Sequence, residues 1–97
     1  MVPPDVASFE VRRFEASDQE RALRLLAGAT IHDGSVAGPR LIRCAVVASG
    51  GSLEKLRYEL EMLKLDYRDV IVAGEYAPKG GHLVRVRDLN EPIEDEA

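Results

Sequence analysis

A regular leucine stripe runs between residues 52 and 67. It recurs at intervals of three and four residues and consists of Leu53, Leu56, Leu60, Leu63 and Tyr67. At about 100° per residue, these side chains fall within an arc of about 80° on a helix. An amphipathic helix must bury such a stripe against a second layer of structure, so the rest of the chain has to supply that layer.

A second helix is predicted over residues 17–28. Ser17 and Glu20 have the spacing of a capping box, in which each side chain accepts a hydrogen bond from a backbone N–H of the other residue. The apolar face of this helix consists of Ala22, Leu23, Leu25 and Leu26. Two helices of this kind can cover one face of a sheet.

Short apolar segments flank and separate the two helices. Residues 8–14 and 82–89 alternate apolar and polar side chains, as half-buried strands do. Residues 40–49 are apolar on both faces, which is typical of a central strand. Residues 69–77 are rich in β-branched side chains, and a short strand is expected at residues 29–32. These segments are therefore interpreted as strands.

The order of these segments predicts an α+β fold of the ferredoxin-like type. Its core is a two-layer β-α-β-β-α-β sandwich, with a mostly antiparallel sheet, two helices on one face and an extra C-terminal edge strand. The 97 residues suffice for one domain, predicted over residues 8–90. A flexible leader is expected at residues 1–7 and an acidic tail at residues 91–97. Because such folds host many functions, the fold alone indicates no activity.

Charge and composition exclude several classes of function. The net charge of -4 comes mostly from acids near the two ends, and the remaining acids and bases nearly balance, so neither nucleic acid nor an anionic membrane is an expected partner. No apolar run approaches the roughly 20 residues of a membrane helix. One cysteine cannot form an internal disulfide, so a cytoplasmic location is expected. No catalytic residue and no cofactor are predicted. No metal site is predicted either, because the two histidines and the one cysteine lack metal-ligand spacing.

Glycine-rich turns predict a candidate anion site. Ser49-Gly50-Gly51-Ser52 connects an apolar run to the start of the helix at 52–67, where free backbone N–H groups attract anions. If the flanking strands are parallel, Lys79 and His82 lie at the same sheet edge. The predicted ligand-binding residues are Gly50, Gly51, Ser52, Lys79 and His82. An ordinary capped turn explains the same glycines and serine, and both interpretations stay open.

Self-association is the second expectation. The sheet face opposite the helices is predicted to be apolar with interspersed arginines, which exceeds what monomers usually expose. A second apolar stripe lies on the helix at 52–67, nearly opposite the leucines. The residues expected to mediate self-association are Arg43, Val47, Arg85 and Arg87 on the sheet and Tyr58, Met62 and Leu65 on the helix. A homodimer follows, since one mixed patch can meet its own copy across a two-fold axis.

The sequence therefore predicts a small cytoplasmic interaction or regulatory domain that self-associates and is not an enzyme. The alternative is a domain that binds a small anion, such as phosphate, at residues 49–52 and 79–82. An enzyme of unassigned chemistry is the last alternative. The chain names no particular ligand, partner or pathway.

Overall fold

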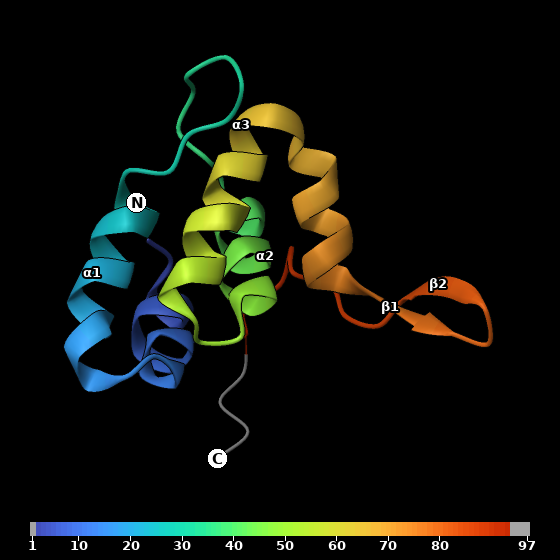
Figure 1. Cartoon of the computed structure of the whole chain (residues 1–97), viewed down its shortest axis with the longest axis horizontal. Coiled ribbons are helices and arrows are strands. Elements are labelled where there is room, and N and C mark those ends of the chain that lie inside the picture. Colours follow the sequence, from blue (N-terminus) through green and yellow to red (C-terminus); the bar gives the residue numbers. More distant parts are fainter. Residues whose placement is uncertain (1, 94–97) are drawn as a thin grey trace.

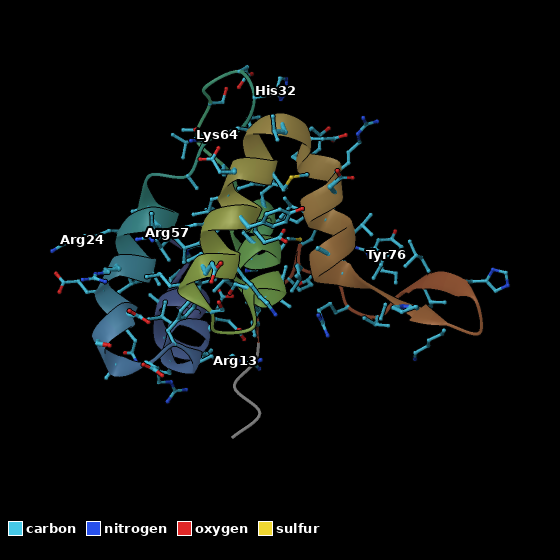
Figure 2. The ribbon with its side chains drawn as sticks, in the orientation of Figure 1. Arg13, Arg24, His32, Arg57, Lys64 and Tyr76 are labelled. Carbon is cyan, nitrogen blue, oxygen red and sulfur yellow. The ribbon has the colours of Figure 1, made fainter. Side chains whose placement is uncertain are left out.

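The computed structural model describes residues 2–93, which form packed helices and a projecting hairpin (Figure 1). The elements are two short N-terminal helical turns, three α-helices and two strands: η1 (Val6–Glu10), η2 (Val11–Arg13), α1 (Ala16–Ala27), α2 (Pro39–Ser49), α3 (Leu53–Glu75), β1 (Tyr76–Lys79) and β2 (His82–Arg85). The strands form one antiparallel two-stranded sheet. The hairpin extends away from the helices, beginning at Tyr76 (Figure 2).

The predicted ferredoxin-like sandwich is wrong. The described residues are mostly helical, and the two strands of the hairpin form a sheet that no helix covers. Residues 29–32 form no strand; only an isolated bridge joins Thr30 to Val36 across the Asp33-Gly34 turn. Part of the last predicted strand is confirmed as β2, which ends at Arg85.

Residues 40–49 belong to α2 and not to a central strand. Pro39 occupies the first turn of this helix, and Gly50 ends it with a φ of 59°. Both are ordinary helix boundary signals. The side chains of Ile42, Cys44 and Ala45 are at most 1% exposed. A helix surrounded by protein is apolar on every side, so its sequence resembles a buried strand.

The leucine stripe is confirmed in part as the buried face of α3: Leu56, Leu60 and Leu63 are buried and Leu53 is half-buried, whereas Tyr67 follows the break at Asp66 and is 38% exposed. The side chain of Ser52 accepts a hydrogen bond from the N–H of Lys55, so it caps the helix as predicted. The helix was expected to end at residue 67 but continues to Glu75. Asp66 interrupts it with extended backbone (φ -158°, ψ 101°), and a second helical section begins there. Its carboxylate accepts from the N–H of Arg68, which is the geometry of an N-cap. The strand predicted at 69–77 is therefore mostly helix.

The N-terminal residues form helical turns where a strand was predicted at 8–14. The buried side chains are those of Val6, Glu10, Val11 and Phe14, whose spacing suits one face of a helix. Asp5 is buried too, within the segment for which a leader was expected. Of the acidic tail predicted at residues 91–97, the first three residues are described, and the N–H of Ile93 donates to Asp5; residues 94–97 lie outside the described residues.

The predicted helix at 17–28 is confirmed as α1, but its capping box is wrong. Glu15 occupies the N-cap position without a side-chain hydrogen bond, and Ser17 lies inside the first turn. Ala22 and Leu26 are the buried residues of this helix. Its position in the fold therefore depends on packing and not on the predicted cap.

The backbones of α2 and α3 come close together at Gly74. A Cβ atom built on Gly74 would lie 2.7 Å from the Cα atom of Cys44 and 2.9 Å from its carbonyl oxygen. These are backbone atoms, so no side-chain rotation can relieve the overlap. Only glycine allows the end of α3 to pack this closely on α2, and this contact sets where the hairpin leaves the helices.

We expect Gly74→Ala to lower the free energy of unfolding by about 1–3 kcal/mol or more, because it overpacks this contact. Urea denaturation followed by circular dichroism measures the change. Gly28→Ala is the matched control, since its Cβ would meet nothing nearer than 3.7 Å and its φ is negative. Equal losses in the two variants would contradict the close packing at Gly74.

Candidate functional site

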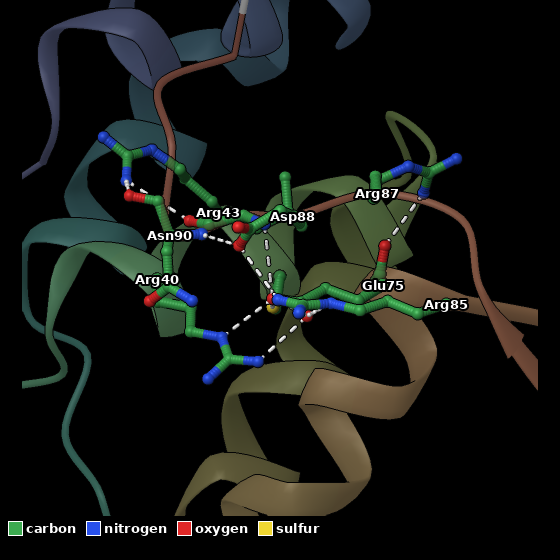
Figure 3. Close-up of polar contacts among 10 residues, drawn as sticks. Arg40, Arg43, Glu75, Arg85, Arg87, Asp88 and Asn90 are labelled. Carbon is green, nitrogen blue, oxygen red and sulfur yellow. Dashed lines mark hydrogen bonds and ion pairs between the residues drawn. The ribbon is translucent and has the colours of Figure 1, made fainter.

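The carboxylate of Glu75 lies at the centre of a polar cluster that joins distant parts of the chain (Figure 3). Its side chain is fully buried. Arg40 of α2 binds both oxygens, with Nε 2.8 Å from Oε2 and Nη2 2.9 Å from Oε1. Arg85 of β2 donates from Nε to Oε1 at 2.9 Å. Such bidentate and charge-assisted bonds are strong and directional, so Glu75 fixes α2 and β2 relative to the end of α3.

The backbone after β2 completes this cluster. The N–H of Leu89 donates to Oε2 of Glu75 at 3.3 Å, and the N–H of Val86 donates to its carbonyl oxygen at 2.8 Å. Arg87 donates to the carbonyl oxygen of Gly74 at 2.8 Å. We call residues 86–93 the C-terminal strap. These bonds hold its first half against the end of α3.

A second buried ion pair holds the other half of the strap. Arg43 of α2 binds both carboxylate oxygens of Asp5, at 2.9 and 3.1 Å, and both side chains are at least nine-tenths buried. Arg43 also donates to the carbonyl oxygens of Leu89 and Asn90, while the N–H of Ile93 donates to Asp5. The N-terminal segment, α2 and the strap therefore meet at this pair.

The ionisation of these groups suits a structural role. The hydrogen bonds from Arg40 outweigh the effect of burial and lower the pKa of Glu75 to about 2. Burial raises the pKa of the Cys44 thiol to about 12, and the carboxylate of Glu75, 3.6 Å from Sγ, adds to this rise. A carboxylate so acidic is a poor general base near neutral pH, and a thiol so basic is a poor nucleophile.

The hairpin has one blocked edge and one open edge. Gly80 and Gly81, with φ of 56° and 82°, form the two-residue turn, as in type I′. The register pairs Ala77 with Val84 and Lys79 with His82. In an antiparallel pair, hydrogen-bonded and non-hydrogen-bonded positions alternate. The hydrogen bond from Val86 to Glu75 shows that this pair is a hydrogen-bonded position. The next pair along the register is therefore not hydrogen-bonded across the hairpin. The backbone N–H and C=O groups of Tyr76 and Pro78 on β1, and of Leu83 and Arg85 on β2, consequently point away from the partner strand.

The two edges differ in their free donors. On β1, Pro78 has no N–H, and the N–H of Tyr76 donates to the carbonyl oxygen of Val72. On β2, the N–H groups of Leu83 and Arg85 have no partner within residues 2–93. All four residues of β2 are exposed. The outer edge of β2, which we call the β2 edge, is therefore the face of the hairpin that can accept another strand.

The structure separates the residues predicted to bind an anion. Gly50, Gly51 and Ser52 form the turn between α2 and α3, whereas Lys79 and His82 flank the tip of the hairpin (Figure 1). Gly51 has a φ of 86°, and a Cβ there would lie 2.6 Å from the carbonyl oxygen of Arg13. The shared sheet edge that would unite the two groups does not exist. Anion binding at either group alone stays a prediction.

The residues predicted for self-association also occupy different surroundings. Arg43 is buried against Asp5, Val47 is half-buried on α2, and Arg85 and Arg87 bind Glu75 and Gly74. They share no open sheet face, because residues 40–49 are helical. On α3, Tyr58 and Leu65 are exposed and Met62 is half-buried. The helix stripe therefore remains a surface, whereas the sheet face does not exist.

Sequence reasoning missed the acidic partners of the arginines. Glu75 is the one charged residue in the apolar run from 70 to 77, and Arg40 and Arg43 are three residues apart in another apolar segment. On a helix that spacing puts both arginines on one side. An isolated acid and two arginines at this spacing therefore indicate buried ion pairs. This indication depends on residues 40–49 forming a helix, which was not predicted.

Comparisons of the chain with protein-family models, curated proteins and solved structures gave no match. None of the helices in residues 2–93 is both long enough and apolar enough to span a membrane. Over the same residues, no three histidine, cysteine or acidic side chains gather into a metal site.

We expect stability to fall in acid because of Glu75. Its pKa is about 2 in the folded chain against an ordinary 4.5, so unfolding takes up a proton between these values and the free energy of unfolding decreases as the pH falls through them. Glu75→Gln should cost about 1–3 kcal/mol near neutral pH and reduce the acid dependence. Chemical denaturation at a series of pH values measures both. An unaltered acid dependence would show that another group titrates.

Cys44 should be protected from thiol reagents in the folded protein. It is buried, and its pKa is about 12, so the reactive thiolate is scarce near neutral pH. We expect a disulfide reagent such as Ellman's to react slowly with the native chain and rapidly in urea. Fast labelling without denaturant would contradict the burial of Cys44 against Gly74 and Glu75.

Proposed function

We propose that this protein is a non-enzymatic interaction or regulatory module that self-associates through the β2 edge. The open edge itself carries the proposal, because free strand donors and acceptors readily pair with another strand. Leu83 is 62% exposed and Val84 is 40% exposed. An isolated two-stranded hairpin is only marginally stable in water, and pairing would place it in a four-stranded sheet.

The side chains of β2 favour one register for two copies. Only Leu83 and Arg85 direct backbone groups outward, so an antiparallel pair makes the most bonds when Leu83 of each copy faces Arg85 of the other. Val84 then lies on the two-fold axis opposite its own copy, and apolar pairs of this kind stabilise sheets. In the register that centres on Arg85, the guanidinium groups of the two copies face each other, and like charges directly opposite destabilise a sheet.

The blocked β1 edge limits the assembly to two copies. A strand pair across a two-fold axis uses the same edge of both chains. Because β1 offers no free outward donor at Tyr76 or Pro78, the four-stranded sheet ends with two edges that resist further pairing. A closed dimer is therefore proposed in place of an open fibre. The buried, unpaired cysteine supports a cytoplasmic location as part of this proposal.

Light scattering coupled to size exclusion tests the proposal, with a dimer expected for the native chain at micromolar concentration. Leu83→Pro should give a monomer, because it removes an outward N–H that β1 does not use; Pro78 already occupies the facing position in the same hairpin. Leu83→Ala is the matched control, since it shortens the same side chain but keeps the donor. It should remain a dimer, weakened by about tenfold at most.

Two other outcomes would contradict the proposal. A native chain that stays monomeric at high concentration contradicts self-association altogether. A dimer that survives Leu83→Pro but dissociates with Met62→Glu uses the Tyr58, Met62 and Leu65 stripe of α3 as its interface. Circular dichroism confirms that each variant remains folded before its mass is interpreted.

A further inference from the structure

A groove of about 390 Å³ lies between α1 and the first section of α3, on a part of the chain that the hairpin does not use. We call it the α1–α3 groove. Its volume falls in the range of binding pockets, about 300–1,000 Å³. Apolar lining comes from Leu25, Ala29 and Leu60. Leu25 is half-buried, whereas Ala29 and Leu60 are buried. Apolar side chains of a ligand in the groove would therefore contact residues at the edge of the hydrophobic core.

The rim of the groove is basic. Three cations line it, Arg24, Arg57 and Lys64, against one carboxylate, that of Glu61. Figure 2 labels all three cations, with Arg24 on α1 and the other two on α3. This excess of positive charge stands on a chain whose net charge is -4. A partner that complements the groove therefore carries negative charge beside an apolar surface.

The existing partners of these cations are weak competitors. Lys64 is 3.6 Å from Glu61, and Arg24 pairs with Glu20 one turn away. All four side chains are more than half exposed, and exposed ion pairs contribute only about 0–1 kcal/mol. Arg57 has no ion-pair partner in the described part of the chain. An incoming carboxylate can therefore bind these cations at little cost.

We propose that the α1–α3 groove docks an acidic amphipathic helix of a partner protein. Arg57 and Lys64 are seven residues apart, so they lie on one side of α3, about 10 Å from each other along its axis. A helix lying alongside α3 presents carboxylates at the same spacing when acidic residues occur at i and i+7. Its leucines at the positions between them enter the groove over Leu25 and Leu60, which is the helix-in-groove mode of recognition.

Fluorescence anisotropy with two synthetic helical peptides tests this proposal. Both carry leucines at i+3 and i+4; one has glutamates at i and i+7, and its twin has lysines at these two positions. The acidic peptide should bind at least about tenfold more tightly than its twin, and added salt should weaken it. Equal binding of the two, or no binding of the acidic one, overturns the proposal.

Matched substitutions then locate the binding site. Lys64→Glu should weaken the acidic peptide about tenfold, whereas Lys55→Glu should not, because nine residues at about 100° each place Lys55 on the opposite side of α3. Equal effects of the two variants overturn the groove assignment. A short DNA duplex that binds with the same Lys64 dependence, while the acidic peptide does not, also overturns the proposal.

The hairpin variant separates this inference from self-association. Leu83→Pro should bind the acidic peptide as the native chain does, because Leu83 does not line the groove. Loss of peptide binding in that variant would show that the dimer, and not the α1–α3 groove, forms the site. The two proposals can therefore fail independently.

Discussion

The ion pair between Glu75 and Arg40 is the contact on which the arrangement of the molecule depends. It joins the last residue of α3 to the first turn of α2, and Arg85 brings β2 to the same carboxylate. The carboxylate is fully buried, so each of its bonds has to be made inside the protein. A loss of any partner leaves charge without full compensation, which makes the geometry of the cluster highly specific.

The position of the hairpin follows from this cluster. Gly74 lets α3 approach the backbone of Cys44, Glu75 then binds Arg40, and the chain passes directly into β1 at Tyr76. The strap returns across the same site and reaches Asp5 and Arg43. The hairpin is thus anchored at its base by buried ion pairs, while its far end extends away from the helices (Figure 1). This anchored base and the open β2 edge are the two features on which the proposed strand pairing depends.

Some of the fold was predictable because the responsible signals are local. The leucine stripe and the Ser52 cap define the start of α3 within a few residues of sequence, and the glycine pair at 80–81 defines the turn of the hairpin. The ion pairs were not predictable in the same way. Asp5 and Arg43 are 38 residues apart, and nothing near either residue indicates its partner.

The sequence by itself determined the amphipathic helices, the Gly-Gly turn and the near balance of charge outside the ends, since each depends on the spacing or count of residues along the chain. Pro39 and Gly50 are boundary signals for a helix at residues 40–49, but the apolar pattern between them suits a buried strand and a buried helix equally. Burial against α3, with Gly74 at the contact, selects the helix. The same packing decided which acid each arginine meets, because buried charge is tolerated only where a distant segment supplies the opposite charge.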